Sequence, residues 1–460
     1  VFAFTLAFFG CFFLLPISET LRGAFFDRNG HFTLAYLLEV FRNPIYLEGL
    51  RNSFLLALLS TILALLLALP LAWISDRFLF PGKSLFSALI LVPMILPPFV
   101  GAIGVRQILG QQGALNALLV HLGLQDPSHP VDWLGQGQLG GVAAMIALNL
   151  YPIIYLNVVA ALANIDPAME EAAENLGCTG FRKFWRVTLP LIMPGLFAGG
   201  TIVFIWAFTE LGVPLMFDFT RVASVQVFNG IKDIGGNPFP YALVAVMLAS
   251  AVLLYAASKL AFGRSAHAMM AKATSQGGPR PAGPVVGPLC TLLFAAVFLV
   301  AVLPHVGVIL VSFSRDWYAT VLPPSFTLDH FRLALGHEMT LPSIQNSLKY
   351  AGLAVILDLF LGVAIAYVVV RTRLVGRQLL DGLAMLPLAV PGLVLAFGYL
   401  AMTQEGKIFS FLNPVRDPLI LLVIAYAVRR LPYVVRSAAA GFQQTSVTLE
   451  EAAQNLGSPP

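Results

Sequence analysis

The chain has 460 residues, of which 58% are hydrophobic and 11% charged, and its formal net charge is +4 at pH 7. Soluble globular domains carry about 25% charged residues, so this composition excludes an ordinary soluble domain. The small positive excess gives no indication of a nucleic-acid partner.

The apolar residues fall in blocks of about 20, a length that crosses a bilayer core of roughly 30 Å. We therefore predict an all-α integral membrane protein, built as a polytopic helical bundle. The first block resembles a signal peptide, but the many further blocks favour a first membrane helix. Ten spans are predicted, at 1–17, 52–75, 86–108, 139–163, 195–217, 240–262, 287–313, 347–370, 379–402 and 418–440.

Prolines mark the third predicted span, which contains Pro93 and Pro97. Proline removes a backbone donor and clashes with the preceding turn, so this span should be kinked. A kinked helix suits a gate around a central path. Plain bending without a gating role is an equally good interpretation of any single proline.

The polar segment 165–190 lies between two predicted spans and has the signals of a short helix. Asp166 suits the N-cap and Pro167 the first helical position. Glu170 and Glu171 follow in the first turns, where the positive helix end favours acidic side chains.

Gly177 suits the left-handed residue that closes this helix, which should be roughly 15 Å long. Ala172, Ala173 and Leu176 share one face. Small alanines on that face would let another surface approach the helix backbone closely.

An ionisable residue, Glu210, falls within the fifth predicted span, four residues before Pro214. Such residues are costly in a membrane and are often functional. We hypothesise that Glu210 faces the translocation path or its gate. The alternative is a carboxylate near the outer interface that pairs with a neighbour.

The stretch 264–286 is rich in Gly, Pro, Ser and basic residues, which predicts a flexible linker. Beyond it, Asp358 is predicted to make a helix–helix contact. Arg429 and Arg430, in the tenth span, are expected to snorkel to the inner surface, and a role in lining the path is the alternative.

An internal repeat divides the chain. Residues 152–177 align without a gap on 432–457, at an offset of 280. Farther upstream the offset is 294, and there Pro93 and Pro97 match Pro387 and Pro391.

The repeat predicts two homologous halves, 1–263 and 287–460, joined by the linker. If the first half has six spans, the second supplies four here, and twelve are expected in all. The counterparts of the polar-helix residues are Glu450, Glu451, Ala452, Ala453 and Gly457.

Lysine and arginine are unevenly distributed between the two sets of loops. The loops on the side of the 165–190 segment hold 11 of them in 73 residues, and the opposite loops hold 10 in 134. The denser side is predicted to be cytoplasmic.

The chain shows no site for catalysis or metal binding. Its seven histidines and three cysteines have no metal-ligand spacing, and we find no nucleophile–base pair. Gly82-Lys83-Ser84 resembles the end of a phosphate-binding loop, but Arg77 occupies the position of the required earlier glycine. We therefore expect no cofactor and no metal in this chain.

The spacing of segment 165–190 is distinctive. Glu171-Ala172-Ala173 is followed by three residues and Gly177, then nine residues and Val187, then one residue and Leu189-Pro190. It resembles the EAA motif of the binding-protein-dependent ABC importer permeases, and Glu451-Ala452-Ala453 with Gly457 repeats its first part.

The resemblance implies that this helix is a coupling helix, which docks into a groove of a cytoplasmic ATPase subunit. Two copies imply two ATPase subunits, which bind ATP and Mg, so the chain itself is not expected to be an enzyme. The other implied partners are a periplasmic substrate-binding protein and the lipid bilayer. The implied location is the bacterial inner membrane, multi-pass, with the EAA loops in the cytoplasm.

Two fused halves resemble ferric-iron importer permeases and also thiamine permeases. The segments 208–219 and 91–104 look closer to the iron group and to relatives for phosphonates. Fe(III) is the expected solute, and thiamine, aminoethylphosphonate and other small polar solutes are alternatives. An ion-coupled secondary transporter is a rival that the two EAA segments disfavour. A membrane enzyme or scaffold is a second rival, which the lack of a catalytic constellation disfavours.

Overall fold

The computed structural model describes residues 2–27, 29–135, 139–231, 237–268 and 279–457. For residues 258, 259, 261–268, 450 and 453 only the backbone is described. The fold is all-α, as predicted; the described residues contain only two strands, β1 (Phe78–Leu79) and β2 (Arg280–Pro281), which pair in parallel.

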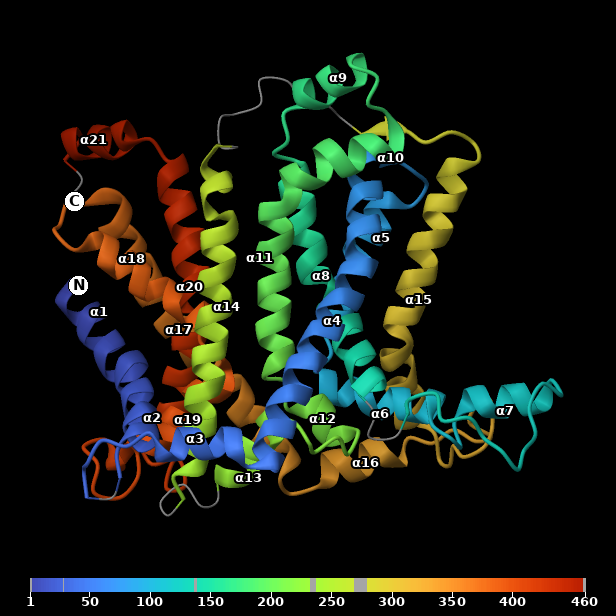
Figure 1. Cartoon of the computed structure of the whole chain (residues 1–460), viewed down its shortest axis with the longest axis horizontal. Coiled ribbons are helices and arrows are strands. Elements are labelled where there is room, and N and C mark those ends of the chain that lie inside the picture. The colour runs from blue at the N-terminus through green and yellow to red at the C-terminus, as the bar shows by residue number, and fades with distance from the viewer. Residues whose placement is uncertain (1, 28, 136–138, 232–236, 269–278, 458–460) are drawn as a thin grey trace. The chain divides into compact units, whose positions relative to one another are not determined.

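The chain forms two compact units. Unit 2 comprises Ile45–Gln226 and Leu253–Ala334. Its helices are α4 (Pro44–Arg77), α5 (Lys83–Leu89), η2 (Val92–Met94), α6 (Pro98–Leu109), α7 (Ala114–His121), α8 (Leu139–Leu162), α9 (Pro167–Asn175), α10 (Gly180–Lys183), η3 (Phe184–Thr188), α11 (Leu189–Phe208), α12 (Gly212–Met216), α15 (Val286–Phe313) and α16 (Asp329–Gly336). Within this unit, α9 and α10 lie at one end of the long helices and α6 and α12 at the other (Figure 1).

Unit 1 comprises Val1–Pro44, Val227–Val252 and Leu335–Pro460. Its helices are α1 (Phe2–Phe9), η1 (Gly10–Leu14), α2 (Leu15–Phe25), α3 (Ala35–Arg42), α17 (Thr340–Arg371), α18 (Arg377–Met385), η5 (Leu386–Leu388), α19 (Gly392–Met402), η6 (Ser410–Leu412), α20 (Leu419–Gln444) and α21 (Val447–Asn455). Four described helices cross the division between the units: α4 at its first residue, α16 at its last two residues, α13 (Ala223–Gly230) and α14 (Phe239–Ala268).

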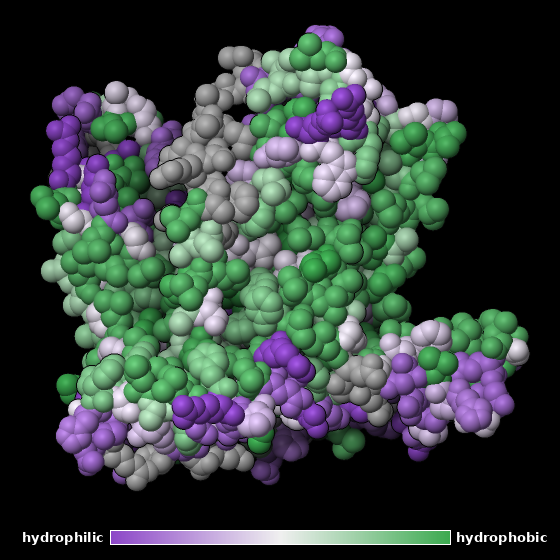
Figure 2. All heavy atoms as spheres, in the orientation of Figure 1, coloured by the Kyte–Doolittle hydropathy of each residue, from purple (hydrophilic) through white to green (hydrophobic). Residues whose placement is uncertain are grey.

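Seven described helices are long and apolar enough to cross a membrane, or nine if each of two bent helix pairs forms one span. These nine correspond to nine of the ten predicted spans. The tenth forms α20, which three arginines, Arg429, Arg430 and Arg436, set apart from the apolar helices. Within each unit, apolar side chains cover the middle of the long helices and hydrophilic ones gather toward their ends (Figure 2).

The kink predicted in the third span of each half is a full break. The two helices of the pair are bent by 99° in the first half and by 103° in the second. Pro97 and Pro391 are extended, with ψ of 134° and 140°, and each precedes the first residue of the second helix. Because Pro93 and Pro387 lie in short 3₁₀ turns just before, an α-helix cannot continue through either segment.

The first span of each half packs in the unit that holds most of the other half. In unit 2, α15 packs along α6, and in unit 1, α2 packs along α19. Two equivalent glycines, Gly104 and Gly398, allow these contacts. A Cβ atom on Gly398 would lie 2.6 Å from the Pro16 carbonyl oxygen, and one on Gly104 would overlap the Pro304 carbonyl oxygen.

The structure describes part of the predicted linker 264–286. Its first residues continue the backbone of α14, residues 269–278 lie outside the described residues, and β2 follows. In the parallel pair of β1 and β2, Phe78 lies opposite Arg280, and the Thr291 hydroxyl donates to the Pro81 carbonyl at 2.8 Å. These bonds join the start of α15 to the loop that follows α4.

Candidate functional site

The short helix predicted between two spans is α9, and its ends are built as the sequence indicates. The Asp166 carboxylate accepts the Ala168 N–H at 3.0 Å, and Pro167 occupies the first helical position. Gly177 has a φ of +79°, and the Cys178 N–H donates to the Ala173 carbonyl at 2.9 Å. Both ends are therefore satisfied within the segment, which makes α9 a rigid element.

Glu170 points into the protein, where it is 6% exposed. Its Oε1 accepts the Thr188 hydroxyl at 2.6 Å and the Arg77 guanidinium. Arg77 is the last residue of α4, and Thr188 immediately precedes α11. One carboxylate thus ties α9 to the ends of two membrane helices.

Electrostatics favour the charged form of Glu170. Burial alone would raise the pKa of this carboxyl, but hydrogen bonds from Arg77 and Thr188 and the positive charges of Arg77 and Lys183 outweigh it. The pKa of Glu170 is consequently below its ordinary value of 4.5. Lys183 also bonds Glu174 at 2.6 Å, and this hydrogen bond and charge lower the pKa of Glu174.

The opposite face of α9 is open. Glu171 and Ala172 are exposed, Ala173 is half-buried, and Leu176 is 88% exposed. An apolar side chain that projects this far from a capped, anchored helix is available to another protein. The two adjacent glutamates therefore face different ways, one inward and one outward.

The second half carries a matching helix, α21. Gly457 has a φ of +88°, like Gly177, and Leu456 is 89% exposed, like Leu176. Glu451 and Ala452 are exposed, whereas the side chains of Glu450 and Ala453 lie outside the described ones.

Each short helix has an arginine contact. Arg77 contacts α9 itself, and Arg371 contacts the segment just before α21. Arg371 is the repeat counterpart of Arg77 and likewise ends the second helix of its half, α17. Its guanidinium donates to the Thr445 carbonyl at 2.9 Å, two residues before α21. The sequence interpretation missed both arginines, although their equivalence at the 294 offset was available as a signal.

Glu210 lies between α11 and α12 rather than inside a continuous helix. Its Oε1 accepts the N–H groups of Gly212 and Val213, at 3.0 and 3.3 Å, and so caps α12. Its backbone carbonyl accepts the Ser224 hydroxyl at 2.6 Å. The fifth helix therefore ends at Phe208, earlier than the predicted 217, because this carboxylate and these loop contacts organise a break.

A polar side chain from the next helix contacts each broken span. In unit 2, the Asn149 amide donates to the carbonyls of Pro93 and Leu96, at 2.6 and 3.4 Å. In unit 1, the Arg429 guanidinium lies directly against Gly392. The expected snorkelling of Arg429 to the inner surface stays a prediction.

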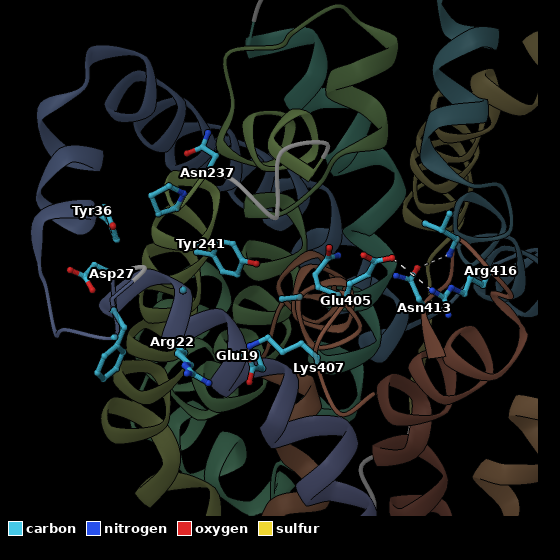
Figure 3. Close-up of a pocket in the computed structure, with 17 residues that line it drawn as sticks. Glu19, Arg22, Asp27, Tyr36, Asn237, Tyr241, Glu405, Lys407, Asn413 and Arg416 are labelled. Carbon is cyan, nitrogen blue, oxygen red and sulfur yellow. Dashed lines mark hydrogen bonds and ion pairs between the residues drawn. The ribbon is translucent and has the colours of Figure 1, made fainter. Parts of the chain in front are cut away.

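A polar pocket of about 790 Å³ opens in unit 1, at the end of α20 remote from α21 (Figure 3). Lys407 and Glu19 form an ion pair at 2.6 Å across it, and Arg416 and Glu405 approach to 3.8 Å. Arg22, Tyr36 and Tyr241 are among its other polar lining residues (Figure 3). Sequence reasoning missed this pocket because its residues come from three distant segments.

No group of three or more His, Cys, Asp or Glu side chains suited to a metal ion occurs in the described part of the chain. The ionisable side chains near the broken spans are single residues on separate helices. The exposed, anchored α9 and the broken spans suit docking and movement of helices.

Comparisons with known proteins begin with families. Residues 45–267 match the family described as "Binding-protein-dependent transport system inner membrane component". The probable molybdenum ABC transporter permease protein of Haloferax volcanii is 31% identical over 258 residues, which cover 52% of this chain and 90% of that protein.

Two similar proteins are named for ferric transport. The ferric transport system permease protein FbpB of Actinobacillus pleuropneumoniae is 28% identical over 433 residues, or 92% of this chain and 59% of that protein. The putative FbpB 1 of Haemophilus influenzae is 28% identical, over 92% of this chain and 64% of that protein. This chain thus spans about three-fifths of the length of these relatives.

Among solved structures, a bacterial ABC transporter for import of the acidic polysaccharide alginate matches with a TM-score of 0.44 at 19% identity. The match covers 58% of this chain and 93% of that one.

Proposed function

This chain belongs to the family of binding-protein-dependent transport system inner membrane components, and on that premise we propose that it is the permease subunit of an ATP-driven importer. The single observation that carries this proposal is the geometry of α9. The helix exposes Glu171, Ala172 and Leu176 while Glu170 fixes it to the ends of α4 and α11.

Such a helix can transmit force. A push on its exposed face would act on two membrane helices at once, because Arg77 and Thr188 share the Glu170 carboxylate. The second copy, α21, would serve a second ATPase subunit. ATP and Mg would be bound by those subunits, and hydrolysis would take place there.

The basic residues of the loops favour an orientation with α9 and α21 in the cytoplasm of a bacterial cell. On that orientation the polar pocket of unit 1 faces outward. A periplasmic binding protein would deliver the solute on this side. The mixture of acidic and basic side chains in the pocket suits contact with a polar protein surface.

The proposed solute is Fe(III), since the two relatives named for ferric transport align with nearly the whole of this chain. Thiamine and aminoethylphosphonate stay as alternatives that the same machinery would carry. The broken spans at Pro93, Pro97, Pro387 and Pro391 are proposed to gate the path.

Glu210 is proposed to belong to the same gate, because its capping bonds hold the break after α11. Glu210→Gln keeps an oxygen acceptor but removes the charge. We expect uptake per assembled complex to fall several-fold, with assembly preserved. Unchanged uptake would show that the Glu210 carboxylate caps α12 and has no role in the gate.

The test of the proposed function uses the full-length protein reconstituted in liposomes with its ATPase and binding-protein partners. ATP hydrolysis is measured with the binding protein loaded with Fe(III) or thiamine. We expect Fe(III) to stimulate hydrolysis, and Glu171→Lys together with Glu451→Lys to abolish the stimulation. Uptake that follows an ion gradient without any ATPase would contradict the proposal.

A further inference from the structure

The repeat places Asn149 and Arg429 at equivalent positions, on helices that begin 280 residues apart. Both contact the broken span of their own half. The two halves therefore have equivalent sites, but the side chain at this site is charged only in the second half. The first half presents a neutral amide and the second a cation.

The first-half site is self-contained. Asn149 is half-buried, and its amide nitrogen is used by the carbonyls of Pro93 and Leu96, which the break leaves without helical partners. This bond satisfies backbone groups at the break. It leaves no formal charge there.

The second-half site makes room for a larger side chain. Position 392 is a glycine, whereas its repeat counterpart is Pro98. A Cβ atom on Gly392 would overlap the Arg429 guanidinium, so the glycine is required for the arginine to take this position. The arginine in place of Asn149 and the glycine in place of Pro98 therefore depend on each other, because the arginine occupies the space that the glycine leaves.

The charge of Arg429 is not neutralised among the described residues. The ionisable groups that act on it are Arg430, of like sign, and Tyr433, whose phenol is uncharged at neutral pH. The carboxylate in this region is Asp358, which is 5% exposed and interacts with Arg430. In addition, Gly392 begins α19, whose amino-terminal end carries partial positive charge and so adds no compensation.

Arg429 also lies well inside α20, as the eleventh of its 26 residues. Charged side chains within membrane helices are costly and are found where they pair or line a path. The half-buried Arg429 has no carboxylate among the charged groups that act on it, so an anionic partner would compensate its charge.

We propose that Arg429 binds an oxyanion group carried by the transported species as it passes the broken span of unit 1. This inference rests on the proposed importer function and specifies the solute further. The oxyanion has two possible sources: it is coordinated to Fe(III), which oxygen ligands accompany in neutral water, or it is itself the solute.

A first experiment tests the site without transport. The purified full-length complex is heated at constant ionic strength in chloride, sulfate or phosphate. We expect sulfate and phosphate to raise the Tm of the wild type by a few degrees more than that of Arg429→Gln, beyond the general stabilisation that these anions give any folded protein. Arg436→Gln, which removes an exposed arginine from the same helix, should keep this additional rise. An equal rise in Arg429→Gln would overturn the proposal.

A second experiment uses liposomes, ⁵⁵Fe(III) on the binding protein and ³²P-phosphate. Arg429→Gln should lower uptake at least about tenfold, with Arg429→Lys within about threefold of the wild type. Phosphate that enters only with iron identifies a coordinated oxyanion, and phosphate that enters alone identifies a free one.

A further variant, Gly392→Ala, displaces the guanidinium without removing its charge and should reduce uptake as Arg429→Gln does. If Arg429→Gln and Gly392→Ala both take up solute as the wild type does, the inference about Arg429 is wrong, but the proposed function still stands. The proposed function fails separately, if the wild type shows no ATP-dependent uptake of any solute.

Discussion

At the residue scale, the most informative pair is Glu170 and Glu171, neighbours in sequence with opposite surroundings. Glu170 is buried against Arg77 and Thr188, whereas Glu171 is exposed. The sequence predicted the helix and its caps because those signals are local. It placed both glutamates on the docking helix without separating their roles, because the direction of Glu170 depends on Arg77, which lies 93 positions away.

Glu170→Gln should destabilise the protein by about 1.5–3 kcal/mol at pH 7, since a charge-assisted bond is lost and Arg77 keeps only part of its partners. Thermal unfolding of the purified complex measures this change. Glu171→Gln is the matched control and should leave the Tm unchanged, because its side chain is exposed.

The effect of Glu170→Gln should also depend on pH, because the pKa of Glu170 is lowered in the folded protein. A carboxyl group whose pKa is lower in the folded state contributes its full stabilisation of the fold at pH values above the unfolded-state pKa, here 4.5. This contribution is lost as the pH falls through the folded-state pKa. The Tm difference between wild type and variant should therefore shrink below pH 4.5. A difference that stays constant down to low pH would show that the charge of Glu170 does not stabilise the fold.

At the element scale, the helices and their breaks follow from local sequence, and their partners do not. Apolar length predicts each span, and paired prolines predict each break. The packing of α2 along α19 depends on a glycine, Gly398, whose role becomes visible only when the Pro16 carbonyl is placed against it. Arg429 and Gly392 are a second case of the same kind.

Gly398→Ala should weaken the packing of α2 on α19, because the added Cβ atom would lie 2.6 Å from the Pro16 carbonyl oxygen. Overpacking of this kind costs about 1–3 kcal/mol. Gly352→Ala is the control, since a Cβ atom there meets nothing within 4 Å. We expect a lower Tm for the first variant and an equal or higher Tm for the second, which gains helix propensity. Equal values would mean that the glycine is not needed for this contact.

At the scale of the whole molecule, the halves share one plan and differ in charge at corresponding places. Both carry a capped helix with an exposed leucine, Leu176 in α9 and Leu456 in α21. By contrast, Asp358 and Arg429 in the second half replace Ala64 and Asn149 of the first. The fused chain can hold such differences, because each half keeps its own sequence.

If both short helices serve ATPase subunits that close together, one damaged helix should suffice to uncouple the machine. Glu171→Lys alone and Glu451→Lys alone should each reduce solute-stimulated ATP hydrolysis by more than half. Both keep wild-type Tm values, as exposed substitutions do. Full stimulation in either single variant would show that one helix is sufficient.

The pairing of α2 with α19 also has a consequence for biosynthesis. The chain between Phe25 and Gly392 is 367 positions long, so the first span is inserted long before its packing partner exists. At bacterial synthesis rates of about 5–20 residues per second, that interval is roughly 20–70 s. During this time the nascent protein presents an unpaired α2 to lipid and to quality-control proteases. Ribosome stalling between the halves should therefore produce a species that is degraded rather than stored.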